Sequence, residues 1–511
     1  MQKIKERYRK IKNEERGLVY HKPHGLGLDF ALTYPNTYHL GMSNLGFQSV
    51  YQLFNQYNRI CCERVFVPDA DIERELERTG GPLLTIESER PVSDFDVLAI
   101  SVSFETDYLN IPKLLRLAKI PVLASERNEW HPLVIMGGAA AFLNPEPVAP
   151  FVDIVCVGEG EVLVPELVRV MNEAESREDL LRRLALEPGF YIPAFYDLHY
   201  HEDGSLGRIE PTEGAPARVF TMRNPMRKQA GAGRFDDEFI PASEILTDNT
   251  EMSGRYLMEI SRGCSMGCRF CWAGYSYLAP RVFSAQRLLE RAAEMRKHTD
   301  KIGLVATAVC DHPEIHELLD GLERLDYQVS VSSLRLDQIS PELLDALVRR
   351  NDQQLAIAPE TGSDRLRRVI NKNLTNDQIV EIADMIFERG IFNLKLYMMI
   401  GLPTEEDQDL DAIVDLTRRI RDRMLEVGRE RGRVGSVIVS LNAFVPKPQT
   451  PFQWEPIMTE RELDRKIKYL TRALKGMPNV EVRAMSSRVA LLQAMLSLGD
   501  RRLSEFILEV D

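Results

Sequence analysis

The chain has 511 residues, 44% of them hydrophobic and 28% charged, which is enough for two or three domains and too apolar for a disordered chain. Its formal net charge of −13 argues against broad electrostatic capture of DNA or RNA, although a specific RNA substrate is left open. Seven cysteines are too few and too unevenly placed for a disulfide framework. The charged N-terminal segment 1–16 has no apolar core for a secretory signal, and the longest apolar run, 133–143, is about half of what crosses a bilayer. We therefore expect a cytoplasmic protein without membrane contact.

Residues 1–190 alternate between apolar runs and amphipathic stretches. The candidate strands are 28–35, 59–68, 97–104, 121–125, 133–138 and 153–161. Strand–helix alternation predicts an α/β fold, here a Rossmann-like parallel sheet, which binds ligands at the carboxyl ends of its strands. Gly137 and Gly138 end one strand, and Gly158, Glu159 and Gly160 end the next. These glycines either let a backbone approach a cofactor closely or only make tight turns.

The rest of the chain divides into three parts. Residues 191–250 are rich in Pro, Gly and charge and are predicted to form a connector. Residues 251–455 contain the candidate strands 255–261, 302–308, 328–334, 354–360, 393–401 and 436–444, with a helical pattern after each of the first five. Six such units predict a partial (β/α)6 TIM-type barrel with its active site at the carboxyl ends of the strands. Residues 456–511 are predicted to form a helical C-terminal region.

Three cysteines, Cys264, Cys268 and Cys271, form a C-x-x-x-C-x-x-C motif directly after the first strand of the second half. Structural zinc usually takes four protein ligands with other spacings, and no convincing fourth ligand is nearby. Three thiolates on one loop suit a [4Fe–4S] cluster with one iron left open. The alternatives are three buried cysteines or a degenerate zinc loop.

The cysteine motif, its place after a strand and the six strand–helix units resemble the radical SAM superfamily. The resemblance implies that Cys264, Cys268 and Cys271 bind the cluster and that S-adenosylmethionine (SAM) chelates the open iron. Reductive cleavage of SAM would then give methionine and a 5′-deoxyadenosyl radical. Trp272 stands where members of the family often place a residue near the adenine, and an electron donor such as flavodoxin or ferredoxin is implied.

Other strand ends carry further candidates for SAM binding. Ser333 and Arg335 follow the third strand of the predicted barrel, and Glu360 and Ser363 match the family's E-x-G-S element after the fourth. By resemblance Glu360 would hold the ribose or the methionine ammonium, while Gly401 matches the glycine whose backbone approaches the adenine. Alternatively, Arg335 and Glu360 form a structural ion pair.

Two residues are candidate catalytic groups. Lys395 lies in an otherwise apolar strand, so it either reaches into the barrel toward a carboxylate, such as that of SAM, or occupies an exposed edge. Cys310 follows the second barrel strand, where a thiol would donate a hydrogen atom or carry a substrate fragment, or would simply be a small hydrophobic residue. Cys61, Cys62 and Cys156 are predicted to be core residues.

Stretches of residues 101–167 resemble the cobalamin-binding domain that precedes the barrel in one large radical SAM subgroup. The D-x-H-x-x-G motif that supplies a histidine to cobalt in many cobalamin proteins is missing, and Asp197-Leu198-His199 only begins it. Many radical SAM relatives also lack this histidine, so cobalamin binding and a domain that has lost cobalamin both stay open. The extended, proline-containing segment 444–454 resembles a part of an uncharacterised group of cobalamin-domain radical SAM proteins, and tRNA methylthiotransferases have a comparable segment.

Three functions follow from these patterns. The first is a radical SAM enzyme that uses cobalamin to methylate an unactivated carbon or a phosphinate. The second is a radical rearrangement, cyclisation or sulfur insertion with a non-functional cobalamin domain. The third is a non-catalytic iron–sulfur regulatory protein. The sequence does not identify the substrate, which is either a small molecule or a macromolecule.

Overall fold

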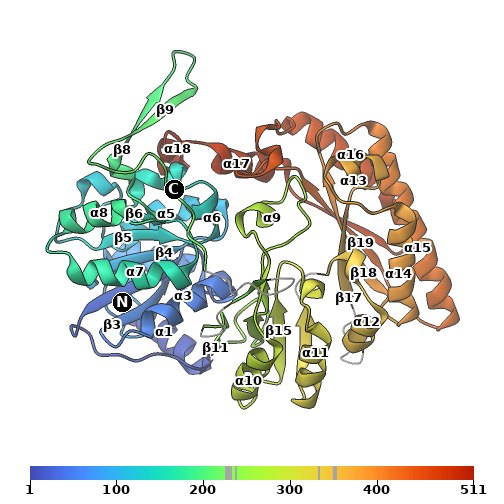
Figure 1. Ribbon diagram of the computed structural model, residues 1–511, viewed down its shortest axis with the longest axis horizontal. Helices are drawn as coiled ribbons and strands as arrows, with labels where there is room; N and C mark the ends of the chain where they lie inside the picture. The colour runs from blue at the N-terminus through green and yellow to red at the C-terminus, as the bar shows by residue number, and fades with distance from the viewer. Residues whose placement is uncertain (225–232, 236–238, 332–333, 349–353, 511) are drawn as a thin grey trace. The chain divides into compact units, whose positions relative to one another are not determined.

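The computed structural model describes residues 1–224, 233–235, 239–331, 334–348 and 354–510, and its contacts divide the chain into two compact units (Figure 1). Unit 1 consists of Met1–Pro225, Pro241–Tyr256 and Gly499–Asp511. Unit 2 consists of Met226–Ile240 and Leu257–Leu498. The four-part division expected from the sequence stays a prediction.

Unit 1 is built on a six-stranded sheet in the order β3-β2-β4-β5-β6-β7. Its strands are β2 (Leu28–Tyr34), β3 (Ile60–Phe66), β4 (Val97–Ser101), β5 (Leu133–Gly137), β6 (Ile154–Cys156) and β7 (Phe190–Tyr191). All neighbours are parallel except β6 and β7, which are antiparallel. Helices such as α3 (Leu45–Asn55), α5 (Ile111–Leu117) and α7 (Gly160–Glu173) connect the strands. The Rossmann-like parallel sheet is therefore confirmed.

A buried arginine lies in the edge strand of this sheet. Arg64 of β3 has no exposed surface. Its guanidinium donates to both oxygens of Glu15, at 2.7 and 2.8 Å, and to Glu87 at 2.6 Å. A buried guanidinium is tolerated because each charge has a bonded partner. The pair also joins the N-terminal segment to the sheet.

The strand expected at 121–125 is not formed. These residues are half-buried or exposed and lead into a short 3-10 turn, η3 (Ala124–Glu126). A strand between helices in a parallel sheet is buried on both faces, so this exposed segment has no place in the sheet.

Later parts of the chain complete unit 1. A hairpin of β8 (Tyr196–Tyr200) and β9 (Leu206–Pro211) follows the sheet, and β11 (Ile245–Leu246) pairs with β1 (Arg16–Gly17). The last helix, α18 (Leu503–Val510), packs on η2 (Glu105–Asn110) and η4 (Glu146–Phe151). Arg501 donates to Glu146 at 2.8 Å and to the Tyr191 hydroxyl at 2.6 Å. Parts of the predicted connector and C-terminal region therefore belong to the core of unit 1.

Unit 2 contains two main sheets, β12-β15-β16 and β17-β18-β19-β20. Their strands are β12 (Tyr256–Glu259), β15 (Lys301–Val305), β16 (Gln328–Val331), β17 (Gln354–Glu360), β18 (Asn393–Ile400), β19 (Val437–Ala443) and β20 (Val480–Ala484). The second sheet is parallel throughout, as is the pair β15–β16. All six predicted strands of the partial barrel are present, so the fold class is confirmed. β20, in contrast, lies inside the predicted helical region and was not expected, because its sequence VEVRA is charged at alternate positions and largely exposed.

Helices separate these strands along the chain. They include α10 (Ala285–Met295), α11 (Ile315–Arg324), α14 (Asn376–Glu388) and α15 (Asp407–Glu430), followed by α16 (Glu460–Lys475) and α17 (Ser487–Leu498). Before α11, the buried His312 faces the carbonyl of Phe283 with Nε2 at 2.9 Å and accepts from the Glu314 N–H with Nδ1 at 3.1 Å. This arrangement needs a neutral ring, and burial lowers the pKa of His312.

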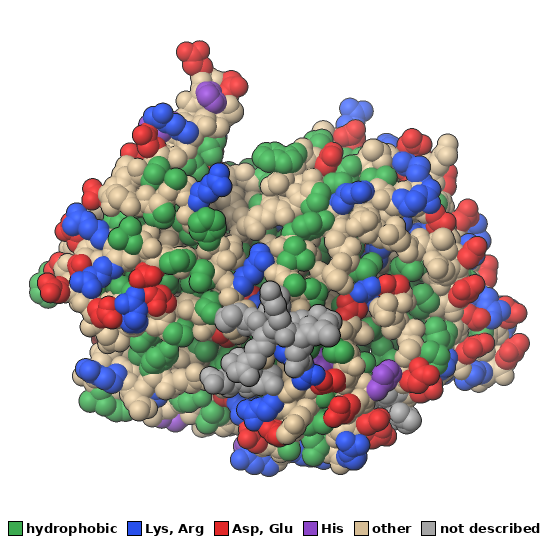
Figure 2. Space-filling model, in the orientation of Figure 1, with side chains coloured by type: hydrophobic (Ala, Val, Ile, Leu, Met, Phe, Trp, Pro, Cys, Tyr) green, Lys and Arg blue, Asp and Glu red, His purple; other side chains and the backbone are tan. Residues whose placement is uncertain are grey.

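On the face shown in Figure 2, basic and acidic side chains are mixed over the surface rather than gathered by sign. Many charged side chains of the described residues are paired, as in Arg419–Asp377 and Arg423–Asp384 between α15 and α14. In the described part of the chain, no helix has the length and apolar character needed to span a membrane.

Candidate functional site

The motif cysteines lie on a loop, 263–272, that we call the cysteine loop. It joins β13 (Ser261–Arg262) to the short helix α9 (Ala273–Ser276). All three cysteines are partly exposed. The loop starts at Gly263, whose φ is +93° and where a Cβ would lie 2.2 Å from the Tyr277 carbonyl oxygen, so only glycine fits. The loop folds back on itself through a hydrogen bond from the Cys271 N–H to the Cys268 carbonyl at 3.0 Å.

One side of the cysteine loop is fixed by the end of α13 (Asp364–Val369). Asn371 has a φ of +60°, and its Nδ2 donates to the carbonyls of Gly267 at 2.9 Å and Met266 at 3.3 Å. The Arg269 N–H donates to the Ile370 carbonyl at 3.0 Å. The loop carbonyls and one loop N–H are therefore satisfied by a segment about a hundred residues later in the sequence.

The other side is fixed by segment 444–454. The Phe452 N–H donates to the Arg269 carbonyl at 3.1 Å, and the rings of Phe452 and Phe444 lie edge to face at 5.8 Å. Both rings are buried in an apolar cluster against which Phe270 of the cysteine loop packs. Trp454, at the end of the same segment, is 86% exposed. The buried aromatic rings of segment 444–454 thus pack against the cysteine loop and help to hold it in place.

The donor set of the cysteine loop fits an iron–sulfur cluster. Burial raises the pKa of the Cys268 thiol to about 11 and also raises that of Cys271, so iron must displace protons when it binds. Within the described ranges, the one group of His, Cys, Asp or Glu side chains close enough to share a single ion lies elsewhere, in unit 1. The wider spacing of the loop thiols suits a cluster, in which each iron takes one thiolate.

An ion pair lies beside the cysteine loop. Glu360, at the end of β17 with a φ of +66°, accepts from Lys372 Nζ at 3.1 Å, and both side chains are 14% exposed. Both charges act on Cys268, where Lys372 lowers the thiol pKa and Glu360 raises it. Lys372 belongs to no sequence motif and was not among the predicted site residues. The turn at the end of α13 brings its side chain back toward Glu360.

Two more candidates lie where strands end. Ser363 caps α13 by accepting from the Leu366 N–H at 3.3 Å. Gly401 follows β18 with a φ of +80°, and its N–H donates to Glu405 at 2.8 Å. Glu405 is itself buried and paired with Lys466. Both candidates therefore have structural roles in this fold, and their contact with SAM stays a prediction.

Arg335 does not pair with Glu360, so that alternative is wrong. Its guanidinium donates to Asp311 at 2.6 Å and to Asp337 at 2.5 Å.

Cys310, next to Asp311, is half-buried, and burial raises the pKa of its thiol. Ser333 lies outside the described residues.

Lys395 lies on the half-buried face of β18, which pairs with β17 on one side and β19 on the other. The edge interpretation is therefore wrong. Lys395 Nζ donates to the Tyr397 hydroxyl at 3.1 Å and lies 4.5 Å from the centre of that ring. In the described part of the chain no carboxylate pairs with this ammonium. Trp272 is half-buried, with its ring 5.1 Å from that of Tyr277.

The glycines of unit 1 are in close contact with the chain itself. A Cβ on Gly138, whose φ is +101°, would lie 2.4 Å from the Val102 carbonyl oxygen. At Gly158 a Cβ would lie 2.4 Å from the carbonyl oxygen of Met222. Glu159 is buried and accepts from the Asn224 N–H at 2.8 Å. Close backbone packing thus explains two of these glycines without a ligand.

Gly137 and Gly160 are less constrained, with a Cβ meeting its first neighbour at 3.6 and 3.2 Å. A cofactor role for all of these positions stays a prediction.

The strand order points to a different place in unit 1, which the sequence analysis missed. The chain crosses from β2 to β3 on one side and then to β4 on the other, so the topological switch point lies between β2 and β4. After these strands, Asn36 Nδ2 donates to the buried Asp107 at 2.8 Å, and Asn44 Nδ2 donates to Ser103 Oγ at 2.8 Å. Burial raises the pKa of Asp107. Strand order cannot be read from a single sequence, so this polar group had no sequence signal.

Family models match both units. A model described as "Radical SAM superfamily" matches residues 258–417, and one described as "Radical SAM proteins, N-terminal" matches residues 46–193. The first match includes the whole cysteine motif, Glu360, Lys372, Lys395 and Gly401.

Relatives extend over most of the chain. An uncharacterised protein of Methanocaldococcus jannaschii is 26% identical over 93% of this chain and 90% of its own length. An uncharacterised methyltransferase of Pyrococcus horikoshii is 21% identical over 64% of this chain and 67% of its own length. The threonylcarbamoyladenosine tRNA methylthiotransferase of Aquifex aeolicus is 20% identical, over 42% of this chain and 54% of its own length.

Among solved structures, the radical S-adenosylmethionine methyltransferase TsrM of Kitasatospora setae is similar, with a TM-score of 0.53 and 14% identity. The match covers 83% of this chain and 75% of that protein, whose structure holds a tryptophan substrate and a SAM analogue. At this identity the likeness is one of fold.

Proposed function

The chain belongs to the radical SAM superfamily, and we propose that it uses SAM and cobalamin to methylate an unactivated carbon or a phosphinate. The observation that carries the radical SAM part is the cysteine loop, which is fixed from two sides and has the Glu360–Lys372 pair beside Cys268. A bound cluster and bound SAM supply an electron and a cleavable sulfonium, and hence a 5′-deoxyadenosyl radical.

The chain's own residues would bind and orient these groups. Cys264, Cys268 and Cys271 would hold the cluster, and Glu360 would accept hydrogen bonds from the ribose or from the methionine ammonium. Among the described residues, the Lys395 ammonium is bonded to the Tyr397 hydroxyl and to no carboxylate, so it would bind a carboxylate of SAM or substrate. Cys310 is the candidate hydrogen-atom donor, and Trp272 the candidate neighbour of the adenine.

Methyl transfer is supported by the sheet of unit 1 and by the name of one relative. Open parallel sheets usually bind ligands where the strand order reverses, which in unit 1 is between β2 and β4. The relative from Pyrococcus horikoshii, which spans about two thirds of this chain, is described as a methyltransferase. Bound cobalamin would supply the methyl group.

A second function, radical chemistry without methyl transfer, is favoured by one observation. The space beside the Cα atoms of Gly138 and Gly158 is filled by the backbone of Val102 and Met222, so these two glycines are explained without a corrin. Rearrangement, cyclisation or sulfur insertion would then be the reaction, with unit 1 serving another purpose. The third possibility, a regulatory protein without turnover, does not explain the Glu360–Lys372 pair beside the cysteine loop.

Two measurements test the proposal. Anaerobic reconstitution should give about four irons per chain, and Cys268→Ala should lose most of them, whereas Cys156→Ala should lose none. A reduced, reconstituted protein should form 5′-deoxyadenosine from SAM, with flavodoxin or ferredoxin able to replace the chemical reductant. Full iron in Cys268→Ala would refute the cluster assignment.

The visible spectrum separates the two reactions. Protein expressed with cobalamin should show corrin absorption bands after removal of free cobalamin. Methyl-labelled SAM should then transfer its label to bound cobalamin. A spectrum without corrin bands refutes methyl transfer and leaves radical chemistry without it.

A further inference from the structure

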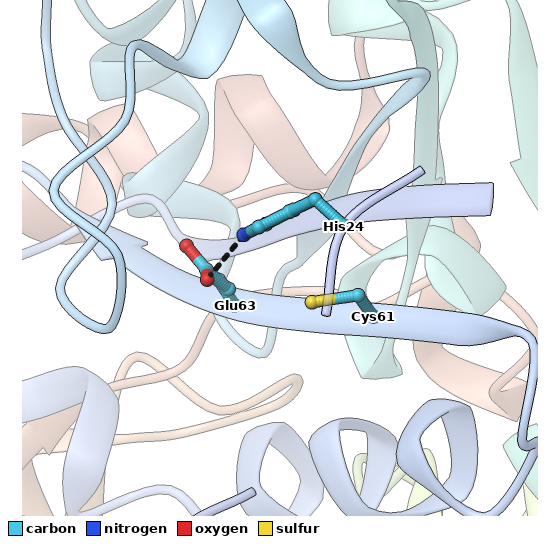
Figure 3. A group of neighbouring side chains, drawn as sticks. All are labelled: His24, Cys61 and Glu63. Atoms are coloured by element: carbon cyan, nitrogen blue, oxygen red, sulfur yellow. Dashed lines mark hydrogen bonds and ion pairs between the residues drawn. The ribbon is translucent and has the colours of Figure 1, made fainter. Parts of the chain in front are cut away.

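Three side chains of unit 1 converge beside the outer strand of its sheet, and radical SAM chemistry does not use them. His24 lies in the loop before β2, and Cys61 and Glu63 lie on β3 (Figure 3). Cys61 and Glu63 are two residues apart and so share one face of the strand, whereas Cys62 lies on the other. We propose that His24 Nε2, Cys61 Sγ and Glu63 Oε1 bind one zinc ion.

The positions of the three atoms suit one ion. They lie within 4.8 Å of one another, and His24 Nε2 is 3.0 Å from Glu63 Oε1. Figure 3 shows the imidazole lying over the strand and the Cys61 sulfur pointing toward the Glu63 carboxylate. Ligands of a tetrahedral zinc at usual bond lengths are about 3.3–3.7 Å apart. Small side-chain movements therefore admit an ion between the three atoms.

The neighbours of these side chains are those that hold metal ligands in place. His24 Nδ1 is 3.0 Å from Asp29 Oδ2, so this carboxylate takes the ring N–H that points away from the ion. The second oxygen of Glu63 accepts from the hydroxyls of Thr85 at 2.5 Å and Ser88 at 2.6 Å, which leaves Oε1 for the ion. A carboxylate behind the histidine and donors behind the ligating carboxylate are the usual support of a metal centre.

Charge also favours a cation here. Glu63 and Asp29 are both about nine-tenths buried or more. Of the nearby positive groups, Arg90 lies 3.4 Å from Asp29 Oδ2. The Lys22 ammonium is instead bonded to the carbonyls of Asn55 at 2.5 Å, Tyr57 at 2.7 Å and Ile60 at 3.1 Å. Without an ion, the His24 ring lies between two carboxylates, with Nδ1 3.0 Å from Asp29 Oδ2 and Nε2 3.0 Å from Glu63 Oε1.

The proposed ion has a structural role. β3 is the outer strand of the sheet, and among the described strands it pairs with β2 alone. Zinc on His24 would hold the loop before β2 against this strand and cover part of its edge. The His24 side chain is 21% exposed, so a water molecule can reach the fourth position. Histidine, thiolate and carboxylate together are a ligand set typical of zinc.

Zinc content of the full-length, cluster-loaded protein tests the proposal. After incubation with zinc and dialysis against metal-free buffer, the wild type should retain about one zinc per chain. The zinc is measured by inductively coupled plasma mass spectrometry. Cys62→Ser, the matched control on the opposite face of β3, should retain the same amount. Cys61→Ser and His24→Gln should each retain less than about a tenth.

Cobalt(II) reports whether the thiolate itself binds. Because an iron–sulfur cluster absorbs in the same region, the spectrum is recorded on the full chain with Cys264, Cys268 and Cys271 replaced by alanine. A sulfur-to-cobalt charge-transfer band should appear there, should persist with Cys62→Ser and should vanish with Cys61→Ser. Circular dichroism checks the folding of each variant, and the partly exposed His24→Gln serves if Cys61→Ser misfolds. Zinc-free wild type after dialysis, or equal zinc in wild type, Cys61→Ser and His24→Gln, overturns the proposal and leaves His24 as a bridge between Asp29 and Glu63.

Discussion

Replacing Phe452 by alanine should loosen the cysteine loop without touching any candidate ligand. Phe452 is 7% exposed, meets Phe444 edge to face at 5.8 Å and shares its apolar cluster with Phe270 of the loop. Truncation of a buried phenylalanine costs about 3–5 kcal/mol. If the whole of this energy is lost from the closed state of the cysteine loop, the fraction of molecules with an open loop rises by about 10²-fold for the lower value and by more than 10³-fold for the upper one.

Iron release is the assay. Reconstituted protein is mixed anaerobically with an excess of a ferrous chelator, and the rate of iron loss is followed by absorbance. Phe452→Ala should release iron at least tenfold faster than the wild type, since only part of the packing is lost when the loop opens. Trp454→Ala, on the same segment but 86% exposed, should stay within about twofold. A wild-type release rate in Phe452→Ala, together with a lowered melting temperature, would refute the idea that this segment supports the loop.

Three further outcomes follow from the structure. Gly138→Ala should lower the free energy of unfolding of unit 1 by about 1–3 kcal/mol in urea melts, because its backbone conformation is almost confined to glycine. Gly137→Ala should change that free energy by less than about 0.5 kcal/mol. Lys372→Met and Glu360→Gln should each lower stability, and the double variant should recover part of the loss, with a coupling energy of about 0.5–3 kcal/mol. Burial lowers the pKa of His312 in the folded state, so the unfolded chain binds more protons than the folded chain as pH falls below about 6.5. The free energy of unfolding should therefore fall there by up to about 1.4 kcal/mol per pH unit. The melting temperature should fall less in His312→Gln than in the wild type between pH 7 and 5.5.

Apolar periodicity located most of the sheet strands, because strands covered by helices on both faces are continuous runs of apolar residues. It missed β20 for the same reason, since that strand is exposed and its sequence VEVRA is polar at alternate positions. It also predicted a strand at 121–125, where the apolar letters lie in a partly exposed turn. Burial, which the sequence does not show directly, decides all three cases.

The cysteine ligands could be predicted because their chemistry depends on spacing along the chain. The groups around them could not, because they depend on folding. Lys372 reaches Glu360 only through the turn at Asn371, and Arg335 takes Asp311 and Asp337 as partners instead of Glu360. A glycine after a strand likewise gives no sign of whether a ligand or the chain's own backbone fills the space beside it.

The path of the chain has a consequence for folding. Unit 1 is assembled from three separate stretches, and the last of them, Gly499–Asp511, is made only after all of unit 2. Until then η2 and η4 lack the helix α18 that packs on them, and Glu146 and Tyr191 lack Arg501. Unit 1 therefore completes its packing only after all of unit 2 has been synthesised. A truncated chain ending near residue 225 would expose the surface of η2 and η4 that α18 covers, and a chaperone would be expected to bind such a chain.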